Sequence, residues 1–162
     1  MDHVSFVQLC REAGQILQLS EPEKLASGEV VTVDNIDLQF IQDTTGGTLA
    51  RLYVEVGEIK PADKVAVYEA LFAIQLLMDG VMDGQFVFDN LHDRMMLLVR
   101  LPLSDETRAD QLAGVIQSFV FQVEQWRATV LLGQLFDSSD DDQFDQPGMM
   151  PPEPMQVAAR LA

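Results

Sequence analysis

The sequence predicts an α+β fold in which an antiparallel, twisted sheet is flanked by helices. Segments with alternating apolar and polar residues lie between segments whose apolar residues recur at helical spacing. Short turns join the alternating segments, and hairpin-linked strands form antiparallel sheets. A length of 162 residues suits one domain with its own core. The expected order is helix, three strands, helix, two strands, helix.

The first half is expected to form one helix and three strands. Helical spacing runs from Val4 to Leu19, and strand-like alternation follows over residues 30–42. Asp34-Asn35 lies in the middle of that stretch and suits a turn between two short strands. The glycines of 44–47 suit a hairpin turn, after which residues 52–56 alternate up to Gly57. We therefore place the third strand at 52–56.

The second half is expected to form two helices around a strand pair. Residues 62–78 contain neither Gly nor Pro, and Gly80 suits the position just after a helix. Strands are predicted at 85–89 and 94–101. Ser104 is a good N-cap, followed by carboxylates in the first turn, so a long helix is expected from there to about Phe136.

The composition changes after Phe136. Residues 137–162 contain four of the seven prolines, and six acidic residues against one arginine. Such sequence buries too little apolar surface to offset the entropy lost on ordering. We predict a folded domain over 1–136 and a disordered, acidic, Pro-rich tail over 137–162.

The net charge of −16 limits the classes of partner. Nucleic acids and anionic lipids require a basic surface, so neither nucleic-acid binding nor membrane insertion is expected. The first residues do not form a cationic region followed by an apolar one, so no signal peptide is predicted. Cys10 is the only cysteine, which suits a reducing compartment. A protein partner is the favoured class.

The middle helix has two apolar stripes, which indicates burial on two sides. Val65, Tyr68, Phe72 and Leu76 form one stripe, and Val67, Leu71, Ile74 and Met78 form the other. A helix that covers one sheet needs only one such stripe. Consecutive apolar residues in the last two strands also point to both faces of the sheet. We expect a second subunit to cover the extra surface, because two-fold dimers are the commonest oligomers.

The sequence offers little catalytic chemistry. His3 and His92 have no neighbouring nucleophile, and Cys10 lies on the apolar stripe of the first helix. A calcium-loop pattern beginning at Asp79 lacks suitable ligands at its third and twelfth positions, Val81 and Asn90. We therefore predict a protein that is not an enzyme and that has no catalytic residues, cofactor or metal ligands.

Three stretches of the sequence together suggest a family. They are 6–10 within the first helix, 33–38 followed by a glycine hairpin and 52–57, and 71–77 leading through a glycine to 86–88. In their order and spacing, residues 1–136 resemble the class I type III secretion chaperones, the Tir-chaperone (CesT-like) family. The tail is longer and richer in proline than this family requires.

The resemblance implies a cytoplasmic homodimer in a Gram-negative bacterium. It would bind the N-terminal segment of one or more secreted effectors in extended form and keep that segment soluble and competent for secretion. The export ATPase would be a further partner. Members of this family dimerise through the second helix and the following strand, which here gives Val67, Leu71, Ile74, Met78, Phe86 and Phe88. Their effector grooves involve the first helix and the early strands, for which we nominate Val7, Leu17, Val33, Leu38, Leu52 and Val54.

Two other functions stay open at this point. A small acidic α+β enzyme, or a domain binding a metal or ligand, would have a concave pocket with convergent polar groups. A regulatory adaptor of the same fold would bind a signalling protein in place of an effector. The sequence does not distinguish the adaptor from the chaperone.

Overall fold

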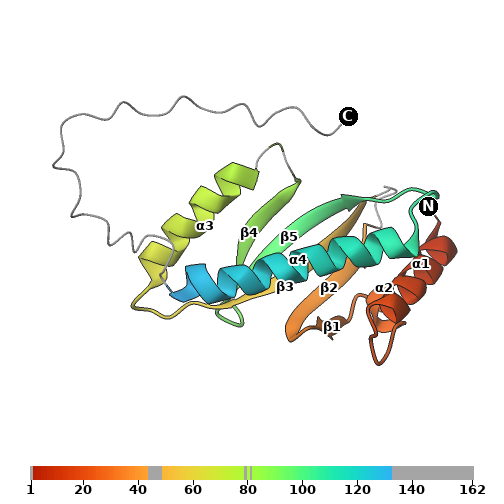
Figure 1. Cartoon of the computed structure of the whole chain (residues 1–162), viewed down its shortest axis with the longest axis horizontal. Helices are drawn as coiled ribbons and strands as arrows, with labels where there is room; N and C mark the ends of the chain where they lie inside the picture. The colour runs from red at the N-terminus through yellow and green to blue at the C-terminus, as the bar shows by residue number, and fades with distance from the viewer. Residues whose placement is uncertain (1, 44–48, 79, 81, 133–162) are drawn as a thin grey trace, which may run out of the picture.

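The chain folds around a five-stranded antiparallel sheet with the strand order β1-β2-β3-β5-β4 (Figure 1). The computed structural model describes residues 2–43, 49–78, 80 and 82–132. The elements, in chain order, are α1 (His3–Ile16), α2 (Lys24–Ser27), β1 (Val30–Val33), β2 (Ile36–Gln42), β3 (Leu49–Glu58), α3 (Lys64–Met78), β4 (Gly84–Asp89), β5 (Arg94–Pro102), α4 (Ala109–Thr129) and a 3₁₀ turn, η1 (Val130–Leu132). The predicted α+β class and the order of its main elements are confirmed.

One face of the sheet forms the core. Alternate residues of β2 and β3 are buried while their neighbours are half-buried, so the side chains of each strand divide between two faces. Helix α4 crosses the buried face and α1 packs against α4 (Figure 1). Two aromatic pairs mark the two ends of this core: Phe6 of α1 stacks on Phe40 of β2 at 5.7 Å, and Trp126 of α4 contacts Phe86 of β4 at 5.2 Å between ring centroids.

A bulge in β3 fixes the end of α4 to the sheet. The register between β3 and β5 shifts between Glu55 and Gly57, and Gly57 has a φ of +133°. The Arg127 guanidinium donates hydrogen bonds to the carbonyl oxygens of Val56 (2.8 Å), Glu55 (2.8 Å) and Asn35 (3.2 Å). These bonds join α4, the bulge and the β1–β2 turn. Gly57 was expected to end the third strand, but the bulge lets β3 continue to Glu58.

Two helix boundaries differ from those expected. The last helix begins at Ala109 instead of near Ser104. Residues 104–107 form a separate turn, in which the Ser104 hydroxyl accepts from the Glu106 N–H (3.2 Å) and the Thr107 hydroxyl accepts from the Ser104 N–H (2.9 Å). Gln111 then caps the helix start by accepting from the Arg108 N–H (3.0 Å). The first helix stops at Ile16, and α2 lies in a connector for which no helix was predicted.

Some predictions fall on parts of the chain that are not described. Three of them lie outside the described residues: the tail 137–162, the end of the long helix at 133–136 and the hairpin turn at 44–47. The two domain limits therefore stay predictions.

Among the described residues, none of the helices has the length and apolar character needed to cross a membrane.

Replacing Gly57 with alanine is expected to destabilise the fold by about 1–3 kcal/mol, because a side chain there must adopt a positive φ. An added Cβ would also lie 3.0 Å from Leu131 Cδ1. Urea unfolding followed by circular dichroism measures the effect. The matched control is Gly114→Ala inside α4, where a Cβ meets nothing within 4 Å and stability should be unchanged or higher. Equal stability of Gly57→Ala and the wild type would contradict this account of the bulge.

Candidate partner-binding surfaces

Helix α3 buries one apolar stripe and exposes the other. Val67 and Leu71 are each 1% exposed and belong to the core. The exposed α3 stripe is formed by large apolar side chains with exposed fractions between 65% and 75%: Val65, Phe72 and Leu76, with Leu77 (78%) beside them. Apolar side chains gathered on one helix face in this way mark an interaction surface.

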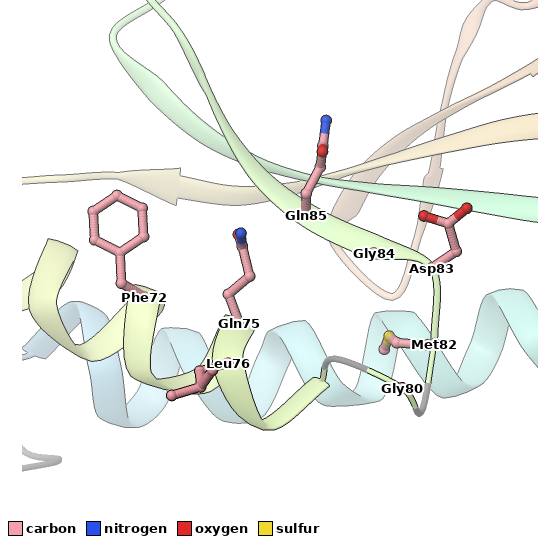
Figure 2. A pocket seen from close by; sticks show the side chains of 8 residues that line it. All are labelled: Phe72, Gln75, Leu76, Gly80, Met82, Asp83, Gly84 and Gln85. Carbon is pink, nitrogen blue, oxygen red and sulfur yellow. The ribbon is translucent and has the colours of Figure 1, made fainter.

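A hollow lies between α3 and the start of β4. It has a volume of about 740 Å³ and is bordered by Phe72, Leu76, Met82 and Gln85, among others. Figure 2 shows Phe72 and Gln75 extending from α3, and Gln85 extending from β4 away from the helix. The Gln75 side-chain oxygen accepts a hydrogen bond from the Phe86 N–H at 2.9 Å. Helix α3 therefore satisfies a backbone donor on the outer edge of β4.

The structure separates the six residues nominated for a dimer interface. Val67, Leu71 and Met78 are buried against their own chain, whereas Ile74 and Phe86 are half-buried. Phe88 is 38% exposed and packs edge-on against Tyr68, with the Lys64 ammonium 5.1 Å from its ring. The sequence revealed two stripes but could not show which one faces the core. Among the described residues, the exposed α3 stripe is the one that its own chain leaves uncovered.

Five of the six residues nominated for effector binding lie in the core. Leu17, Val33, Leu38, Leu52 and Val54 are at most 8% exposed. Only Val7 is half-buried, and it lines a hollow of about 660 Å³ along the outer side of α1. The nominated strand residues occupy the face that the helices cover. The residues between them in sequence are the accessible ones.

The opposite face of the sheet, which no helix of the described residues covers, is called here the helix-free face. It carries a hollow that the sequence analysis did not identify. It has a volume of about 410 Å³ and is lined by side chains of β1, β2, β3, β4 and β5, including Asp37, Tyr53, Glu55, Met96 and Val87. Strand alternation could have located it, because each of these residues lies one position from a core residue. Strand β1, whose Val30 also lines this hollow, forms an edge of the sheet. Among the described strands it pairs with β2 alone, and Val30 is 55% exposed. The β1 edge can therefore accept a further strand.

Several ionisable side chains of the described residues have pKa values that their surroundings shift. Burial raises the pKa of the Cys10 thiol to about 12, which makes it a poor nucleophile at neutral pH. The His92 side chain lowers the pKa of Asp89 through a hydrogen bond of 2.7 Å. Within the described part of the chain, no group of three or more His, Cys, Asp or Glu side chains could hold a metal ion.

Comparison with known proteins gives a structural match and no sequence match. No protein-family model matches the chain, and no curated protein matches its sequence. A chain of the crystal structure titled the ExsC–ExsE complex is similar in fold, with a TM-score of 0.62 and 13% identity. The match covers 80% of this chain and 97% of that one. The chain therefore shares its α+β fold with a chain of that complex, and these comparisons do not show that it belongs to the CesT-like family.

Replacing Gln75 with leucine is expected to lower stability by about 1 kcal/mol, because the Phe86 N–H loses its acceptor. Exchange of the Phe86 amide hydrogen should become faster, as followed by NMR. The control is Gln85→Leu, since Figure 2 shows that side chain extending away from α3. If Phe86 exchanged equally fast in the wild type and in Gln75→Leu, helix α3 would not protect the β4 edge.

Proposed function

We propose that this protein is a type III secretion chaperone that binds the N-terminal segment of one or more effectors in extended form. The observation that carries the proposal is a fold shared with the ExsC–ExsE complex, together with uncovered apolar surfaces on α3 and on the helix-free face of the sheet. The similar fold comes from a chain of the ExsC–ExsE complex, a structure in which two different proteins bind each other. Bound in this way, the effector segment stays soluble and competent for secretion.

The exposed α3 stripe is the proposed interface between two copies of the chain. Its side chains are large and apolar, and burial of each stabilises an interface by about 1.5–3 kcal/mol before the cost of association is subtracted. A two-fold axis near this stripe would place the same residues of both subunits against each other. The hollow beside Phe72 offers space for side chains from the second copy.

The effector segment is proposed to bind as an added strand with side chains in adjacent hollows. The open β1 edge offers backbone hydrogen-bonding groups, and the helix-free face offers apolar side chains beside it. A net charge of −16 keeps a protein with open grooves in solution. We propose a cytoplasmic protein without enzymatic activity, with the secretion ATPase as a further partner.

Replacing Phe72 with aspartate is expected to convert the dimer into a folded monomer, because it places a charge in the proposed interface. Light scattering after size exclusion gives the mass, and circular dichroism reports folding. The matched control is Phe121→Asp on α4, where the phenylalanine is 63% exposed and lies outside the stripe. Leu71→Asp should unfold the chain, because Leu71 is 1% exposed. A stable Phe72→Asp dimer would exclude this interface.

Affinity capture from the source bacterium, followed by mass spectrometry, tests the function. One or two dominant partners held through their N-terminal segments are expected. A signalling protein in their place would favour the regulatory adaptor, and a dimer without any protein partner would favour a ligand-binding domain.

A further inference from the structure

The hollow on the helix-free face has an apolar floor. Tyr53 of β3 pairs with Gln39 of β2 and Leu98 of β5, while Met96 of β5 pairs with Val87 of β4. Directly paired residues of antiparallel strands point to the same face with their Cβ atoms about 5 Å apart. Tyr53, Met96 and Val87 are half-buried although no described helix covers them, and all three line the hollow, with Met96 beside Val87 and diagonal to Tyr53.

The rim of the same hollow is negatively charged. It contains the carboxylates of Asp37, Glu55 and Asp89 against one guanidinium, that of Arg94. Arg94 is shared between two of them, forming an ion pair with Glu55 and lying 3.5 Å from an Asp89 oxygen. His92 contacts the same oxygen as Arg94, with its Nδ1 2.7 Å from Asp89 Oδ2.

Asp37 differs from the other two carboxylates. It accepts a hydrogen bond from the Thr32 hydroxyl at 2.7 Å, and in the described part of the chain it forms no ion pair. Asp37 and Gln39 are two positions apart on β2, so both point to the helix-free face, about 7 Å apart along the strand. Asp37 therefore offers a charge next to the apolar floor that an incoming cation can pair with.

We propose that this hollow selects an extended partner segment in which an apolar side chain and a Lys or Arg lie two positions apart. Such residues point to the same side of an extended chain, about 7 Å from each other. The apolar side chain would rest on Tyr53 and Met96, and the cation would pair with Asp37. This inference rests on the proposed function, because it states which effector segments the chaperone prefers.

Three capped ten-residue peptides test this specificity on the full-length protein. In the first, serine fills every second position, and valine and lysine alternate in the positions between. The second has glutamate in place of each lysine. The third has the composition of the first, with valine and lysine on opposite sides of the extended chain. NMR titration of ¹⁵N-labelled protein gives the affinity and the residues contacted.

The first peptide is expected to bind more tightly than either control and to shift the amide signals of Tyr53 and Met96. Asp37→Lys should weaken the binding of the first peptide by about fivefold or more, which corresponds to the loss of an exposed ion pair of about 1 kcal/mol. Glu124→Lys on α4 makes the same change in net charge away from the hollow and should have less than about a twofold effect. If Asp37→Lys failed to fold, Asp37→Asn compared with Glu124→Gln would replace the pair.

Equal binding of the first and third peptides, or equal weakening by Asp37→Lys and Glu124→Lys, would show a nonspecific attraction and overturn the inference. Changes in amide signals confined to residues of α1 or α3 would also overturn the inference. The proposed function is tested separately by effector capture. Captured effectors without peptide selectivity would overturn only this inference, whereas selectivity without captured effectors would overturn the function.

Discussion

The structure depends on burying only one face of its sheet. Helix α4 crosses that face, and α1 and α2 complete the cover, so the alternate side chains of β2 and β3 sit in a dry core. Aromatic pairs at both ends, Phe6 with Phe40 and Phe86 with Trp126, hold the layers together. Because the strands are pleated, the other half of their side chains point away from α1, α2 and α4, to a face that no described helix covers. The uncovered face is thus a direct consequence of the fold.

Helix α3 stands apart from this two-layer arrangement. It lies beside β4, at the edge of the sheet, where Gln75 satisfies the Phe86 N–H (Figure 1). In this position it covers one edge of the sheet and leaves the β1 edge open. The same position turns the exposed α3 stripe outward. The proposed dimer contact and the proposed effector contact therefore lie at different parts of the molecule, so that both can be formed at once.

The sequence was sufficient to predict the class and order of elements because hydrophobic periodicity depends on local spacing. The sequence was insufficient where a tertiary contact determines the end of a strand or the start of a helix. Gly57 looked like the end of a strand, but Arg127, 70 positions later, binds the carbonyl groups around it and stabilises a bulge. Ser104 looked like a helix cap, but its hydroxyl closes a turn that precedes α4.

The partner-binding residues were harder to predict than the fold. Alternation shows that Leu52 and Tyr53 point to opposite faces, but only the packing of α4 shows that Leu52 is inside. The nominated residues were the most apolar ones, and in a strand the most apolar residues are those most often buried in the core. The two stripes of α3 posed the same problem, since Leu71 and Phe72 are both apolar and only one of them faces the chain.

Export of the captured partner tests the central claim most directly. The partner would be followed in the culture medium of the source bacterium with the gene for this protein intact, deleted, or restored by complementation. The account predicts that deletion removes this partner from the medium, that other exported proteins still appear there, and that complementation restores it. Unchanged export of the partner after deletion would contradict the proposal that this protein is its secretion chaperone.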